Sequence, residues 1–238
     1  MEKSSFSVFI YLKKIFRIIN YLFLFLFFMN ILSCFLKFVA GHPNVYGLVP
    51  RFEFRTENNV PTYFSSFNLL VSAILLKVIA LFKKIEKDRF FHNWSILSVI
   101  FLFLSIDETA SMHELLTYPL KKNFTLTGIF NYSWVIIGFL FVLILFIFYS
   151  RFLFSLPSKT KYQFLLAGFI FVGGAIGIEM IGGNYKYFNP EENLVYAIIT
   201  TFEESFEMIG VIIFIGALIN YIENNISDVT VIFKSKNR

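Results

Sequence analysis

The sequence predicts an all-α fold, a polytopic membrane helix bundle of about six transmembrane helices. Three observations predict it. Hydrophobic residues make up 57% of the 238 residues and charged residues only 16%, whereas soluble domains carry about 25% charged residues. The apolar residues form six runs, each about as long as the roughly 20 residues that a span requires. Lys and Arg gather in alternate connections between these runs, which is typical of a multi-pass membrane protein.

The six predicted spans cover residues 18–40, 63–83, 93–116, 131–155, 162–184 and 194–222. All six prolines fall between them, as expected for a residue that interrupts helices. The first run is too long for the apolar region of a signal peptide, so we expect it to remain a membrane helix. Residues 1–17 then form an N-terminal segment, with a short interfacial helix predicted at 5–17, and residues 223–238 form a tail.

The distribution of basic residues predicts the orientation. The N-terminal segment, the second and fourth connections and the tail hold 14 Lys and Arg, whereas the other three connections hold five. Lys37 and Lys77 lie within spans, where long side chains can reach the interface. The positive-inside rule therefore places both termini in the cytoplasm.

Composition excludes several functions. The net charge of +5 comes without a basic stripe interleaved with exposed aromatics, so nucleic-acid binding is not expected. The expected partner is membrane lipid. The single cysteine, Cys34, excludes an intrachain disulfide and any multi-cysteine metal site.

Acidic residues inside the predicted spans are the strongest functional signal. An ionised carboxylate in a membrane costs at least ~2.5–3.5 kcal/mol, so such residues usually face the bundle interior and have a function. Seven of the 16 acidic residues lie in spans. They are Asp107, Glu108 and Glu114 in the third span, Glu179 in the fifth, and Glu203, Glu204 and Glu207 in the sixth.

Spacing predicts that these acids share a site. Asp107, Ser111 and Glu114 follow an i, i+4, i+7 pattern, and Glu203 and Glu207 follow i, i+4, which places each set on one helical face. At ~1.5 Å per residue, all seven fall in the middle or outer half of the membrane.

The three acidic spans contain no Lys or Arg, and His113 is their one other titratable nitrogen. The acids must therefore be protonated, with coupled titrations, or hold a bound cation. The candidate ligands are the seven acids together with His113. Carboxylate-rich sites of this kind suit a divalent ion such as Mg²⁺, Mn²⁺, Ca²⁺, Fe²⁺ or Zn²⁺.

Plainer interpretations remain for some of these features. The acids can act as structural glue by hydrogen-bonding neighbouring helices. Gly173-x-x-x-Gly177 and the other glycines of the fifth span predict close helix packing. A phosphate loop is less favoured because no strand precedes them. The hydroxyls near the acids are expected to bond carbonyls one turn back.

The patterns S-I-D-E-x4-H-E, G-I-E-M-x-G-G and E-E-x-x-E-M-x-G, starting at Ser105, Gly177 and Glu203, resemble those of a group of uncharacterised small multi-pass bacterial membrane proteins. The resemblance runs from Asn59 through the sixth span. It implies a bacterial inner (plasma) membrane location and no particular activity. Alkaline-ceramidase-like hydrolases do not match, because the three histidines do not share one side of the membrane. Di-iron bundles match only in part, because Glu204-x-x-Glu207 lacks the histidine.

Three functions are compatible with the sequence. The first is a metal-dependent enzyme acting on a lipid-phase substrate, with its catalytic residues unassigned. The second is a cation or proton-coupled transporter that uses the same acids. The third is a non-catalytic assembly or structural protein in which the acids only join helices.

Overall fold

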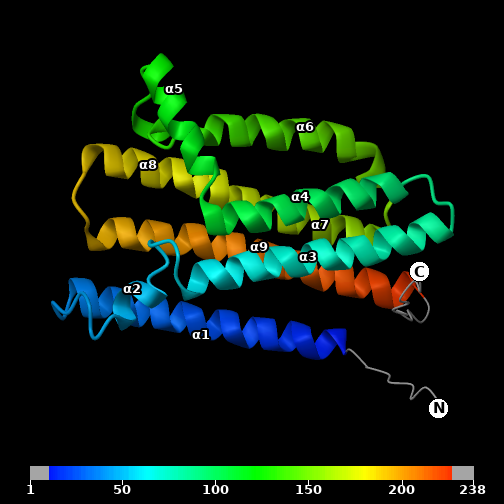
Figure 1. Cartoon of the computed structure of the whole chain (residues 1–238), viewed down its shortest axis with the longest axis horizontal. Helices are drawn as coiled ribbons and strands as arrows, with labels where there is room; N and C mark the ends of the chain where they lie inside the picture. The colour runs from blue at the N-terminus through cyan, green and yellow to red at the C-terminus, as the bar shows by residue number, and fades with distance from the viewer. Residues whose placement is uncertain (1–10, 227–238) are drawn as a thin grey trace, which may run out of the picture.

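The structure is a computed structural model that describes residues 11–226, in which no strand occurs. The predicted all-α class is therefore confirmed. Six helical rods are long and apolar enough to cross a membrane, and Figure 1 shows them lying side by side. They are α1 (Leu12–Phe38), α3 (Val60–Ile85), α4 (Phe91–Ala110), α6 (Trp134–Ser155), the continuous rod of α7 (Ser158–Val172) and α8 (Glu179–Phe188), and α9 (Leu194–Asn225).

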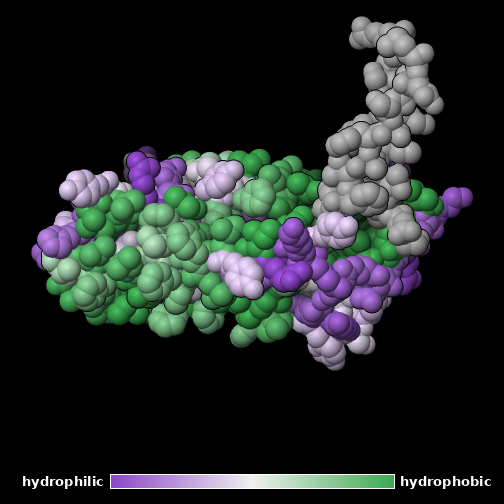
Figure 2. Space-filling model, turned by 90° about the horizontal axis from the view of Figure 1, so that it is seen from below, coloured by the Kyte–Doolittle hydropathy of each residue, from purple (hydrophilic) through white to green (hydrophobic). Residues whose placement is uncertain are grey.

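The described chain starts and finishes at one end of the bundle (Figure 1). The connections 86–90 and 156–157 lie at this same end. The opposite end carries the short helices α2 (Leu48–Phe52) and α5 (Thr117–Asn123), with 3₁₀ turns at His113–Leu116 and Gly128–Phe130. This arrangement agrees with an even number of spans. Figure 2 shows a broad hydrophobic surface over the middle of the bundle, with hydrophilic residues gathered toward its ends.

Local sequence explains where two of the rods begin. Asn59 caps α3 by accepting a hydrogen bond from the Thr62 amide at 3.0 Å, and Asn193 caps α9 through the Tyr196 amide at 3.0 Å. An Asn side chain at this position satisfies one of the amides that a helix start leaves unpaired. Both caps lie at the end opposite the termini.

The described part of the interfacial helix predicted at 5–17 is continuous with the first span. Residues 12–17 are the first turns of α1, which runs without a break to Phe38, because no glycine or proline interrupts this apolar segment. The rest of that prediction, residues 5–10, lies outside the described residues, as do residues 227–238 of the tail.

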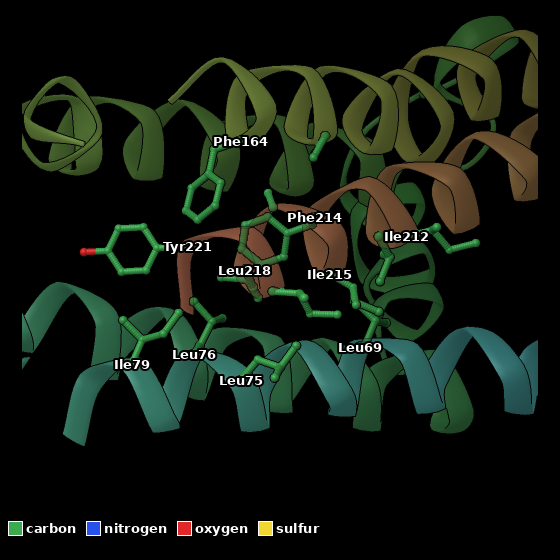
Figure 3. Packing of buried hydrophobic residues seen from close by; sticks show 14 of the residues in the cluster. Leu69, Leu75, Leu76, Ile79, Phe164, Ile212, Phe214, Ile215, Leu218 and Tyr221 are labelled. Atoms are coloured by element: carbon green, nitrogen blue, oxygen red, sulfur yellow. The ribbon is translucent and has the colours of Figure 1, made fainter. Parts of the chain in front are cut away.

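Helix α9 is the centre of the bundle and is buried along much of its length. Figure 3 shows its apolar side chains between those of α3 on one side and Phe164 of α7 on the other. In a bilayer such contacts stabilise by van der Waals packing, because lipid tails are as apolar as Leu. Close approach is possible at Gly210, where a Cβ would lie 2.7 Å from the Phe171 amide nitrogen.

Polar side chains fix the register between helices. Ser66 of α3 and Ser105 of α4 each donate to the other's carbonyl, at 2.7 and 2.9 Å. Asn30 of α1 is fully buried, donates to the Thr201 hydroxyl at 2.9 Å and accepts from the Phe54 amide at 2.8 Å. These bonds attach α4 and α1 to the centre of the bundle.

An ion-pair network, the outer clasp, joins α1, the α2–α3 connection and the α8–α9 connection. It comprises Lys37, Glu53, Arg55 and Glu192. Glu53 is only 1% exposed and lies 3.1 Å from the Lys37 ammonium and 2.8 Å from the Arg55 guanidinium. Lys37 is therefore paired within the protein, whereas the sequence suggested that it only reaches the interface.

Candidate functional site: an acid-lined cavity

A cavity of about 690 Å³ lies between α3, α4, α6, the α7–α8 rod and α9. It is lined by all eight residues that the sequence nominated, which come from three rods and one connection. These are Asp107, Glu108, His113, Glu114, Glu179, Glu203, Glu204 and Glu207. The acids therefore do not point outward to lipid on separate faces.

Helix α9 contributes three of the acids. Glu203 and Glu207 are one helical turn apart, and Glu204 is the neighbour of Glu203. All three are half-buried, and the surface that they expose borders the cavity. Glu108 of α4 is also half-buried and has the Ser65 hydroxyl of α3 beside it.

The third predicted span ends earlier than the sequence suggested. Helix α4 stops at Ala110, and Ser111 has a left-handed φ of 49°, so Asp107, Ser111 and Glu114 do not share one helical face as predicted. The chain instead folds back over the helix end. As a result His113 lies against Asp107, with Nδ1 2.8 Å from Oδ2 and its backbone amide donating to Oδ1 at 2.8 Å.

His113 lies in the turn after α4, beyond the end of the spanning helix, and is held by its surroundings. The His113 ring packs on Trp134 with centroids 4.6 Å apart. Burial favours the neutral imidazole, but the hydrogen bond and the charge of Asp107 outweigh it, so the pKa of His113 is raised above its usual value. This histidine is therefore a partner for Asp107 rather than an unpaired metal ligand.

Glu179 connects the fifth rod to the sixth. The Trp134 indole donates to its Oε1 at 3.3 Å, and Glu203 of α9 is its acidic neighbour. Gly182 lies beside the Glu203 carboxyl group, and a Cβ there would be in ordinary van der Waals contact with Glu203 Oε2, at 3.6 Å. Two neighbouring carboxylates that both carried a bare charge would repel each other, so a proton or a cation between them is stabilising.

The α2–α3 connection adds two residues that the sequence analysis missed. Glu57 and Arg55 both line the cavity, although both lie outside the predicted spans. The Ser111 hydroxyl donates to Glu57. Burial and the neighbouring charge of Glu57 raise the pKa of Glu114. The one sequence signal for Glu57 was its position on the same side of the membrane as Glu114.

The basic groups at the cavity leave most of its acids unpaired. Arg55 is held by Glu53 at 2.8 Å and by Glu192 at 2.5 Å, both in the outer clasp, and His113 pairs with Asp107. Among the lining residues within 11–226, Glu57 and Glu114 of the connections have no ion-pair partner, and neither do the five acids within the rods, which are Glu108, Glu179, Glu203, Glu204 and Glu207. The cavity is therefore a strongly acidic compartment inside the bundle.

The glycines and hydroxyls have structural roles, partly different from those predicted. Of the glycines predicted to pack closely, Gly174 makes the close contact with α9, whereas Gly173 and Gly177 do not: a Cβ at Gly174 would lie 2.8 Å from the Glu203 carbonyl, but Cβ atoms at the other two would meet nothing within 4 Å. A π-helix at Gly173–Ile178 joins α7 to α8, and it turns Gly174 toward α9. Thr201 and Ser205 bond carbonyls one turn back, as predicted.

The arrangement does not fit a resident metal ion. Within residues 11–226, no group of three or more His, Cys, Asp or Glu side chains is placed so that it could hold one ion. The acids are spread around the cavity wall and Asp107 already engages His113. We therefore assign no step to a metal.

Comparison with known proteins gives a family without an activity. The sequence model of a family described as a domain of unknown function (DUF8692) matches residues 19–221. No curated protein and no solved structure matches the chain.

Proposed function

The chain belongs to the DUF8692 family, and we propose that it is a carrier that binds a cation in the acid-lined cavity and exchanges it for protons. One observation carries the proposal. Five carboxyl groups from three rods line one cavity within the spanning region, without a basic partner there. Such groups are stable either protonated or with a cation bound, and alternation between these two states is proton-coupled exchange.

A second cavity, at the end of the bundle that carries the α3–α4 connection, supports a carrier rather than an open channel. This cavity of about 440 Å³ lies near Asp88 and Arg89. Phe152 lines both cavities, is 2% exposed, and packs edge-on against Trp94 with ring centroids 5.0 Å apart. This aromatic barrier separates the two cavities, as alternating access requires.

A flux measurement tests the proposal. Full-length protein in liposomes that contain a pH dye is given an outward proton gradient and then Na⁺, K⁺, Mg²⁺, Mn²⁺ or tetraphenylphosphonium. We expect at least one of these cations to accelerate proton movement, and Glu203→Gln to abolish the acceleration. Glu223→Gln is the matched control, because Glu223 pairs with Lys13 and is not among the cavity residues. A wild-type rate equal to that of empty liposomes for every cation would refute the proposal.

An enzyme acting on a lipid-phase substrate is the second candidate, and one observation favours it. Asp107 fixes His113 through Nδ1, and His113 Nε2 has no hydrogen-bond partner among residues 11–226. A histidine held in this way suits general-base catalysis. In that case a lipid extract incubated with the protein should be chemically altered, and His113→Gln should prevent this. Recovery of every lipid unchanged argues for the carrier.

A further inference from the structure

The cavity has two chemically different halves. The carboxyl groups described above line one half. The other half, between α4, α6 and α7, is apolar and largely aromatic, with walls formed by Phe101, Phe141, Phe146, Phe164, Leu145 and Leu153. Binding sites for organic ligands are mostly apolar, with a few placed polar groups that fix orientation. A small hydrated ion would use only the acidic half.

Helix α6 forms one wall of the apolar half and is attached mainly at its two ends. At one end Trp134 contacts His113 and Glu179. At the other end the Tyr149 hydroxyl donates to the Asn93 carbonyl at 3.1 Å, and Phe152 packs on Trp94. In Figure 1, α6 lies at the edge of the bundle. The middle of α6 therefore borders the cavity.

Several aromatic residues that line the cavity keep much of their surface uncovered by the protein. Phe141 is 44% exposed, Phe146 is 54% and Phe169 of α7 is 79%. These side chains lie within predicted spans, so this wall lies at the depth of the hydrocarbon. A ligand with an apolar part that entered from the bilayer would meet this wall.

We infer that the ligand of this cavity is an amphiphilic organic cation, whose charged group lies among the carboxyl groups and whose apolar part lies against the aromatic wall between α4, α6 and α7. The inference rests on the proposed function and specifies its substrate class. Two complementarities support it: the acidic half offsets positive charge, and aromatic faces attract cations as well as apolar groups. The volume of about 690 Å³ is in the range of roughly 300–1,000 Å³ found for small-molecule sites.

Binding of radiolabelled tetraphenylphosphonium to full-length protein in lipid nanodiscs tests the inference. We expect saturable binding, and we expect tetramethylammonium, which has the charge but little apolar surface, to compete at least about 100-fold less well. Phe141→Ala should weaken binding about tenfold, as truncation of a central aromatic contact does. Glu203→Gln should weaken it as well. Phe148→Ala is the matched control, because Phe148 is on α6 and 75% exposed but does not line the cavity.

The outcomes separate this inference from the proposed function. The proposed carrier function stands if an inorganic cation drives proton flux and Glu203→Gln abolishes that flux. The inference of an amphiphilic ligand is refuted, independently of that result, if tetraphenylphosphonium does not bind saturably or if Phe141→Ala leaves its binding unchanged. If tetramethylammonium competes as well as tetraphenylphosphonium, the apolar half is not part of the site. Melting temperatures of Phe141→Ala and Phe148→Ala that match the wild type show that a binding loss does not come from unfolding.

Discussion

Single residues at the cavity are constrained by contacts that their place in the chain does not reveal. His113 shows this best. It faces Asp107 at 2.8 Å, packs on Trp134, and has Glu108, Glu114 and Glu179 as further acidic neighbours. Its pKa is raised, and histidine in an unfolded chain titrates near 6.5. The pair therefore stabilises the fold fully below about pH 6.5, and this stabilisation is lost as pH rises through the folded pKa.

We predict that His113 stays protonated above its usual range and that Asp107→Asn lowers its pKa. The reason is that the neutral amide keeps the size of the carboxyl group but removes its charge. Nuclear magnetic resonance of ¹⁵N-labelled histidines in nanodiscs measures this, and His113→Gln assigns the signal. A His113 pKa at or below the usual value, or one that Asp107→Asn does not change, would contradict the pairing.

Among the helical elements, the α7–α8 rod is held close to α9 by one of two adjacent glycines. A Cβ at Gly174 would lie 2.8 Å from the Glu203 carbonyl and 3.1 Å from Glu207 Cγ, whereas a Cβ at Gly173 would have open space. The backbone of α9 cannot give way cheaply at Glu203. The contact therefore also positions two of the cavity acids.

We expect Gly174→Ala to destabilise the protein by about 1–3 kcal/mol, the usual cost of overpacking, and to disturb cation binding. Gly173→Ala is the matched control. It should be neutral or slightly stabilising, because alanine is favoured over glycine in a helix by up to about 1 kcal/mol. Thermal unfolding in nanodiscs compares the two. Equal melting temperatures would show that α7–α8 is not packed on α9 at Gly174.

At the scale of the whole molecule, the outer clasp joins three parts of the chain that are far apart in sequence. Glu53 has two basic partners and almost no exposure, whereas the Glu192 side chain is 54% exposed. The hydrogen bond from Arg55 lowers the pKa of Glu192 to about 2. The contribution of Glu192 to the stability of the fold is therefore fully present above the pKa of this group in the unfolded chain, near 4.5, and is lost only as pH falls toward about 2.

Glu53→Gln should lower stability by about 3 kcal/mol, because it leaves two buried basic groups with one exposed partner. Glu191, the exposed neighbour of Glu192, offers the control: Glu191→Gln should have no effect. The readout is the melting temperature in nanodiscs near neutral pH. If Glu53→Gln melts like the wild type, the clasp makes no net contribution.

The orientation of the whole bundle is a further prediction. Both described ends of the chain leave from one end of the bundle, and the charge bias places that end in the cytoplasm. Reporter fusions within 45–60 and 120–128 should read as external, and a fusion at 86 as cytoplasmic. A cytoplasmic signal at 120–128 would invert the topology, and the carboxyl half of the cavity would then face the cytoplasm.

The sequence by itself determined the helical class, the six rods and the eight residues of the candidate site. These follow from local physics: an apolar run of about 20 residues can satisfy its backbone in lipid only as a helix, and a carboxylate in such a run has to avoid lipid. The sequence also placed acids on three rods at a similar depth, which is why they line one cavity.

Only the tertiary structure decided how those residues are used. The end of α4 at Ala110, the fold-back of His113 onto Asp107, the entry of Glu57 and Arg55, and the contact at Gly174 all depend on segments distant in sequence. The apolar half of the cavity is likewise invisible in the sequence, because a phenylalanine facing lipid and one facing a cavity look the same in an apolar run. Which face a helix turns inward is set by its neighbours. The apolar wall of the cavity is therefore known only from the structure, and this wall points to the class of ligand.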